Sequence, residues 1–92
     1  MKINLKVTGL ELTAAIESYL REKLAHLEKF IGGGAEEVTI RTELAKQTQH
    51  HRHGDFFQAE VNLHLAGRNL RAVASEDNLY SAIDLVKDEM IN

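Results

Sequence analysis

The stretch SEDNLYSAIDLVKDEM, from Ser75 to Met90, decides the fold because a helix start signal precedes one apolar stripe. Ser75 can accept hydrogen bonds from the free N–H groups of a first helical turn, and Glu76 and Asp77 favour the positive end of the helix dipole. Helical spacing separates the four apolar residues of the stripe, Leu79, Ile83, Val86 and Met90. The pattern predicts a helix that begins near Ser75 and packs one face against a sheet.

Four segments elsewhere have the alternating pattern of half-buried strands. They span residues 2–8, 37–44, 57–65 and 69–74. A first helix is predicted from Ala14 to Phe30, with Thr13 as its N-terminal cap and three glycines after its end. Residues 45–55 are predicted to form a polar, histidine-rich loop between the second and third strands.

The element order β-α-β-β-β-α predicts the α+β fold class. Short links make the last three strands antiparallel, whereas the first helix is long enough for a right-handed parallel crossover between the first two strands. Each strand has one apolar face, so we expect one four-stranded mixed sheet with both helices on one face, in a single domain of residues 1–92. The expected core is Ile3, Leu5, Ile16, Leu20, Leu24, Val38, Ile40, Val61, Leu63, Leu79, Ile83 and Val86.

Composition excludes several classes of protein. The 92 residues include no cysteine, which rules out disulfides and thiolate zinc sites and is typical of a reducing cytoplasm. No apolar run approaches the roughly 20 residues that cross a bilayer, so we predict a cytoplasmic protein without a membrane partner. The net charge is −3, but residues 1–53 carry eight Lys or Arg against seven Asp or Glu, whereas residues 54–92 carry three against seven. Any cationic surface therefore comes mainly from the first half.

Two runs of residues resemble the ribosome hibernation factors, also called sigma-54 modulation proteins. The run LYSAIDLV at 79–86, with its acidic start signal, is similar to the family's C-terminal signature, and KLAHLEKF at 23–30 is similar to a run in its first helix. With the Thr-x-Ala-Ile motif at 13–16, the resemblance covers nearly the whole chain. It implies a ribosome-binding domain, similar in fold to double-stranded-RNA-binding domains. It also implies a factor that occupies the mRNA/tRNA channel of the small subunit and inhibits translation under stress or in stationary phase.

The candidate site is a basic flank on the first helix. A helical projection puts Lys23, His26 and Lys29 on one flank, which from the residues alone is either a solvated edge or a binding surface. The resemblance implies that the flank meets phosphates of small-subunit ribosomal RNA, together with basic residues of the strands and the second helix. The remaining candidates are Lys2, Lys6, Arg41, Arg68, Arg71 and Lys87. We expect one exposed positive strip, whose disruption by Glu at 23 and 29 weakens subunit binding without unfolding.

Two features depart from this interpretation or compete with it. Family members continue the second helix into a basic extension, whereas here Lys87 is the only cation after Arg71. The acidic balance, and Leu85 pointing away from its helix's apolar stripe, would suit a protein-interaction module that modulates transcription. The sequence leaves the oligomeric state open.

Three histidines, His50, His51 and His53, form the other conspicuous cluster. Imidazoles this close can bind zinc or nickel, which would allow a metal-dependent enzyme, but a polar loop lacks the fixed geometry of such sites and Arg52 adds repulsion. We expect a solvated or RNA-contacting loop without a tightly bound metal. Nothing resembles a nucleophile elbow or a Ser-His-Asp constellation, so we predict no catalytic residue, no cofactor and no small-molecule substrate.

Overall fold

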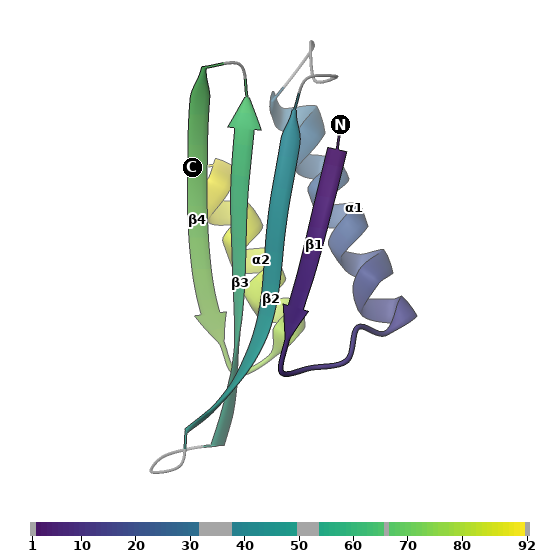
Figure 1. Cartoon of the computed structure of the whole chain (residues 1–92), viewed down its shortest axis with the longest axis vertical. Coiled ribbons are helices and arrows are strands. Elements are labelled where there is room, and N and C mark those ends of the chain that lie inside the picture. The colour runs from purple at the N-terminus through teal and green to yellow at the C-terminus, as the bar shows by residue number, and fades with distance from the viewer. Residues whose placement is uncertain (1, 32–37, 50–53, 66, 92) are drawn as a thin grey trace.

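A computed structural model describes residues 2–31, 38–49, 54–65 and 67–91. The elements follow one another as β1 (Lys2–Thr8), α1 (Ala14–Ile31), β2 (Thr39–Gln49), β3 (Gly54–Leu65), β4 (Arg68–Glu76) and α2 (Leu79–Ile91). The strands are ordered β1-β2-β3-β4 in one sheet, with β1 parallel to β2 and the other neighbours antiparallel (Figure 1). The predicted α+β class and element order are confirmed.

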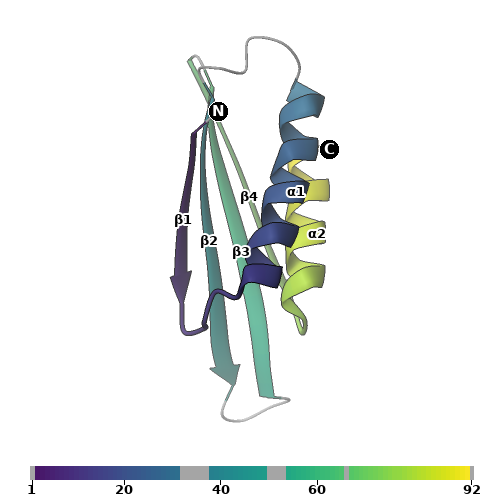
Figure 2. The same ribbon diagram turned by 90° about the vertical axis from the view of Figure 1, so that its right-hand side faces the viewer.

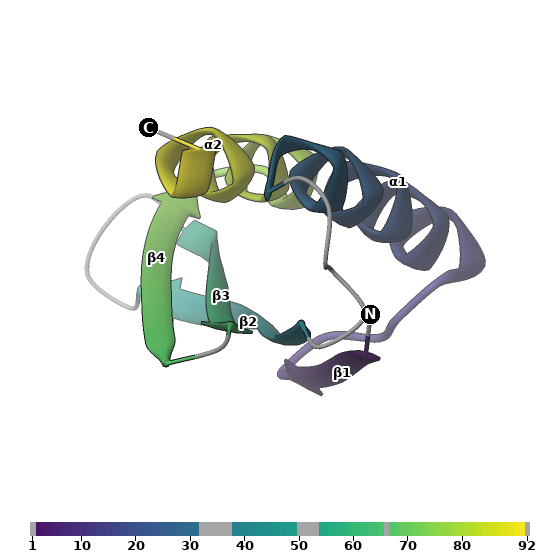
Figure 3. The same cartoon turned by 90° about the horizontal axis from the view of Figure 1, so that it is seen from above.

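Both helices cover the same face of the sheet and leave the other face open, as predicted (Figure 3). The best-buried side chains come from the middle of both layers and include Leu20, Leu24, Ile40, Leu63 and Ile83. The expected core residues Ile3, Leu5 and Ile16 are only partly buried, because β1 is an edge strand and Ile16 lies in the first turn of α1. Sequence alternation therefore identified the core face but overstated burial at its margin.

A buried polar group interrupts this core. Thr42, in β2, points to the helix-covered side of the sheet and is only 3% exposed. Its hydroxyl oxygen has no hydrogen-bond partner within the described residues. An unsatisfied buried hydroxyl costs stability, since it has lost its hydrogen bonds to water.

The two helix starts differ in how well the sequence predicted them. Thr13 caps α1 as expected, because its hydroxyl oxygen accepts a hydrogen bond from the Ile16 amide at 3.1 Å. The prediction that Ser75 caps the second helix is wrong, since Ser75 and Glu76 still pair with β3. Asn78 is the cap instead, and its side-chain oxygen accepts from the Ser81 amide at 3.2 Å.

The hairpin of β2 and β3 is longer than predicted. Residues 45–49 pair with residues 54–58, so the expectation of a loop over 45–55 is wrong for this part of the chain. The hairpin projects beyond both helices (Figure 2), and its β2 side, residues 45–49, is polar apart from Ala45. Alternation of apolar and polar residues, on which the prediction relied, is weak in such strands. His50, His51 and His53 lie outside the described residues.

The domain is a thin slab, with Cα extents of 46 × 25 × 17 Å. The helices run in the same direction, and both begin at the end from which the hairpin projects (Figure 2). Neither of them, over the residues described, has the length and apolar character needed to span a membrane. The slab therefore has two broad sides, one made by helices and one by the open sheet face.

Candidate nucleic-acid interface

The structure divides the predicted site residues between the two broad sides of the slab. The flank formed by Lys23, His26 and Lys29 belongs to α1, in the helical layer. Strand alternation instead turns four other candidates to the open face, because their neighbours along each strand face the core; these are Lys2, Lys6, Arg41 and Arg71. Arg68 is exposed at the start of β4, and Lys87 lies in α2. The expectation of one continuous positive strip is therefore wrong.

The helical layer is closed by a polar seam between α1 and α2, formed by Tyr19, Lys23, Tyr80 and Asp84. The Tyr19 hydroxyl donates a hydrogen bond to the Asp84 carboxylate, whose two oxygens lie 2.6 and 2.8 Å away. This hydrogen bond and the burial of the phenol raise the pKa of Tyr19 to about 12. The Tyr80 ring meets the Tyr19 ring edge-on, with 4.9 Å between centroids.

Lys23 belongs to this seam rather than to an open surface. Its Nζ lies 3.6 Å from the Asp84 carboxylate and 5.0 Å from the centre of the Tyr19 ring. Only 20% of the Lys23 side chain is exposed, so the prediction that it stands free on the flank is wrong. A helical projection locates a side chain on its own helix but does not reveal a carboxylate on a neighbouring one. His26 and Lys29, one and two turns further along, are exposed as predicted.

Ion pairing separates the candidate cations into two groups. Lys23 is paired with Asp84, Arg71 with Glu60 and Lys87 with Asp88. Within the described part of the chain, the other lysine and arginine candidates form no ion pair; they are Lys2, Lys6, Lys29, Arg41 and Arg68. These five keep their charge available for an anionic partner.

The open face of the sheet carries rows of side chains that the strand register brings together. The first row is Lys2, Thr39, His64 and Asn69, and the second is Asn4, Arg41, Asn62 and Arg71. We call these two rows the polar rows. They contain three cations and no carboxylate, whereas the next row contains both Glu43 and Glu60. One end of the open face is therefore positive on a chain whose net charge is −3.

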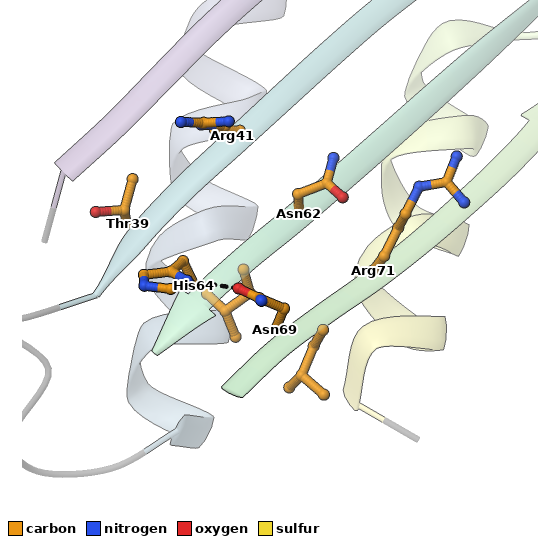
Figure 4. A pocket seen from close by; sticks show the side chains of 8 residues that line it. Thr39, Arg41, Asn62, His64, Asn69 and Arg71 are labelled. Carbon is orange, nitrogen blue, oxygen red and sulfur yellow. Dashed lines mark hydrogen bonds between the residues drawn. The ribbon is translucent and has the colours of Figure 1, made fainter. Parts of the chain in front are cut away.

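Part of the polar rows lines a shallow depression of about 600 Å³. Figure 4 shows the side chains of Arg41, Asn62, His64, Asn69 and Arg71 rising from β2, β3 and β4 on the side away from the helices. The His64 ring is hydrogen-bonded through Nδ1 to the side-chain oxygen of Asn69. Six of the eight residues that line the depression are polar, and Leu63 and Leu70 complete the lining.

Glu60 holds two of these side chains in place from the adjacent row. Its Oε2 accepts from Arg71 Nε at 3.1 Å and from Asn62 Nδ2 at 2.9 Å. The bond from Arg71, followed by the bond from Asn62, lowers the pKa of Glu60, so the carboxylate is charged at neutral pH. Arg71 and Asn62 are therefore preorganised, while the guanidinium end of Arg71 stays exposed to solvent.

Sequence reasoning missed the polar residues Asn62, His64 and Asn69. Each was visible on the polar side of an alternating strand, but their proximity to Arg41 depends on strand register, which the sequence does not state. Among the residues that the structure describes, no three His, Asp or Glu side chains gather as metal ligands would. The prediction about metal at His50, His51 and His53 falls on residues outside that part.

Comparison with known proteins shows which family the chain resembles. Residues 3–92 match the family described as sigma 54 modulation protein / S30EA ribosomal protein. A ribosome hibernation promoting factor of Azotobacter vinelandii is 30% identical over 91 residues, which cover 98% of this chain and 76% of that protein. A ribosome hibernation promotion factor of Lactococcus lactis subsp. cremoris is also 30% identical over 98% of this chain, which spans only 45% of that longer protein.

Solved structures share the fold. The N-terminal domain of Protein Y from Thermus thermophilus superposes with a TM-score of 0.76 at 27% identity, covering 99% of this chain and 92% of that one. A ribosomal subunit interface protein from Coxiella burnetii gives a TM-score of 0.80 over 99% of this chain and 90% of that one, at 18% identity, which supports the fold alone. The family match spans nearly every residue of both helices and all four strands, and the chain therefore belongs to the sigma 54 modulation / S30EA ribosomal protein family.

Proposed function

We propose that this chain is a non-catalytic, cytoplasmic ribosome-binding factor that occupies the mRNA/tRNA channel of the small ribosomal subunit. In that position it inhibits translation under stress or in stationary phase. Family membership supports the proposal, as do relatives named hibernation promoting factors that align with 98% of the chain. The structural observation that carries it is the presence of unpaired cations on both broad sides of a thin slab.

The physical mechanism is steric exclusion held by phosphate contacts. Lys29 lies on the helical side, while Lys6 and Arg41 lie on the open face, and the slab is only 17 Å deep between Cα atoms at its thinnest. A channel walled by RNA presents phosphates on both sides, so a thin domain with cations on two sides can be held between the walls. No bond is made or broken, and the mechanism requires neither metal nor cofactor.

Sedimentation with purified small subunits at two salt concentrations tests the proposal. Lys6→Gln and Lys29→Gln each remove one unpaired cation, from the open face and from the helical side respectively. Arg21→Gln is the matched control, because Arg21 is ion-paired with Glu17 on the same helix and is not a candidate contact. Binding of the parent should weaken steeply with salt, and each lost contact should lower the slope of log K against log salt by about 0.7 to 0.9.

The control variant should keep the parent's salt slope, and all variants should retain the parent's unfolding temperature. Inhibition of translation by purified ribosomes should fall in proportion to the loss of subunit binding. If binding is insensitive to salt and unchanged in both cation variants, RNA contacts do not hold the domain. The alternative of a protein-interaction module, for which exposed Leu85 is the natural contact, would then be favoured.

A further inference from the structure

We propose that the depression in the polar rows holds an unpaired nucleotide of an RNA strand. This inference rests on the proposed function and deepens it, because the cations of the open face were expected only to meet phosphates. The site lies between β2, β3 and β4, and its parts are a cation for phosphate, two amides for a base edge and flat groups for stacking (Figure 4).

The phosphate contact falls to Arg41. Among the described residues no carboxylate pairs with this guanidinium, and it stands directly across from Asn62 in the strand register. Arg71 stands on the other side of Asn62, so the two arginines are roughly 10 Å apart at Cα, two strand spacings. An anionic group that reaches Arg41 therefore brings the attached base over the amides.

The two amides offer complementary hydrogen-bonding groups. Asn62 uses its Nδ2 to donate to Glu60, which leaves its oxygen as an acceptor. Asn69 uses its oxygen to accept from His64, which leaves its Nδ2 as a donor. An unpaired base presents both donors and acceptors on its Watson–Crick edge, and side-chain amides are suited to such mixed edges. Both asparagines are already oriented by their protein partners.

The depression also contains flat side chains on which a base could stack. Proteins that bind unpaired bases stack them on aromatic rings or on the planes of arginine side chains. In the depression these groups are the anchored guanidinium of Arg71 and the imidazole of His64. The volume of about 600 Å³ lies within the range of pockets that hold small ligands.

The same observations argue against a protein partner and against duplex RNA at this site. Protein interfaces have an apolar centre, whereas every side chain of the polar rows is polar. The two leucines of the lining, Leu63 and Leu70, pack against the core on the other side of the sheet. A duplex keeps the Watson–Crick edges of its bases occupied by pairing and offers only groove edges and 2′-hydroxyls, so Asn62 and Asn69 could not make the Watson–Crick contacts proposed for them. An unpaired nucleotide satisfies both amides and the cation.

The test is binding of short single-stranded RNA oligonucleotides to the full chain, followed by fluorescence anisotropy and by NMR signals of the amide side chains and the His64 ring. Asn69→Ala and Asn62→Ala each remove one amide from the depression. Gln58→Ala is the matched control, because it removes an amide from the same open face, two rows away. We expect signals of the depression to shift, affinity to fall about tenfold in each asparagine variant, and the control to bind as the parent does.

Four results would overturn the assignment. They are equal affinity in all three variants, shifts confined to α1, a duplex that shifts the same signals as strongly, or an acidic peptide that occupies the depression where RNA does not. Subunit sedimentation with the same variants separates the two proposals. Salt-dependent subunit binding that ignores Asn62 and Asn69, without oligonucleotide binding, removes the nucleotide site and leaves the proposed function. Oligonucleotide binding in the depression without subunit binding removes the proposed function and leaves the site.

Discussion

The two broad sides of the sheet treat charge in opposite ways. On the helical side, Lys23 is matched by Asp84 and covered by Tyr19, so its charge serves the packing of α1 against α2. On the open side, Arg41 has no carboxylate partner among the described residues, and the polar rows around it contain none. The presence of a basic residue in the sequence therefore does not identify a binding site. Its neighbours across elements decide whether the charge is already satisfied.

The largest expected change in stability comes from truncating a buried side chain under the helices. Leu24 is 2% exposed beneath the seam, and Leu24→Ala should lower the free energy of unfolding by about 2 to 5 kcal/mol, through lost burial and a residual cavity. Denaturant unfolding measures the change. As a control, the exposed Ala25 of the same helix should tolerate Ala25→Ser with a change within about 0.5 kcal/mol. A similarly small effect for Leu24→Ala would contradict the packing described here.

The seam itself can be examined through the Tyr19 phenol. Since Asp84 is the main cause of the raised pKa of Tyr19, Asp84→Asn should bring that pKa from about 12 toward the ordinary value of 10.0. The stabilisation from this hydrogen bond is present below pH 10, and it is lost as pH rises through about 12. Ultraviolet titration of phenolate, with Tyr19→Phe to assign the signal, measures the shift. Titration of Tyr19 near 10 in the parent would mean that the seam is open in solution.

The buried Thr42 hydroxyl, on the helical side of the sheet, has no hydrogen-bond partner among the described residues, and its removal should change stability. Thr42→Val replaces the buried hydroxyl by a methyl group of similar size, and should raise the free energy of unfolding by about 1 kcal/mol. Thermal and denaturant unfolding measure the gain. The exposed Thr8, on the open side of β1, gives the contrasting variant Thr8→Val, which should bring no such gain. If Thr42→Val destabilises the domain instead, a hydrogen-bond partner for this hydroxyl exists in solution.

The smallest expected change in stability concerns the ion pair between Glu60 and Arg71 on the open face. Glu60→Gln removes a partly exposed ion pair with Arg71, so it should cost less than about 1 kcal/mol at neutral pH. The pKa of Glu60 is lowered in the folded chain, so the pair stabilises above the ordinary value of 4.5 and the effect is lost as pH falls through the folded value. Unfolding curves of parent and variant should therefore converge in acid. A constant difference from neutral to acid pH would contradict the charge-assisted pairing.

The sequence predicted those parts of the fold that depend on local pattern. The Thr13 cap, the apolar stripe of α2 and the alternating faces of β1 follow from residues close together in the chain. The start of α2 was misplaced because Ser75 can cap a helix or continue a strand, and pairing with Gln58 favours the strand. That choice depends on a tertiary neighbour, which local pattern does not contain.

The candidate site was less predictable for the same reason. Lys23 and Asp84 are 61 positions apart, and nothing in either segment indicates that α1 and α2 put them side by side. Asn62 and Arg71 meet only because β3 and β4 pair in one particular register. The sequence shows where each cation stands in the chain, but packing decides which of them are ion-paired.

Because α1 and α2 run parallel, their backbone dipoles add and make one end of the molecule more positive than the other. Two antiparallel helices would cancel each other's backbone dipole, whereas these add, placing about half a positive charge per helix at the end where the β2–β3 hairpin projects. A polyanion close to the slab therefore meets a more favourable backbone field at the hairpin end than at the opposite end. Added salt should screen that difference between the two ends.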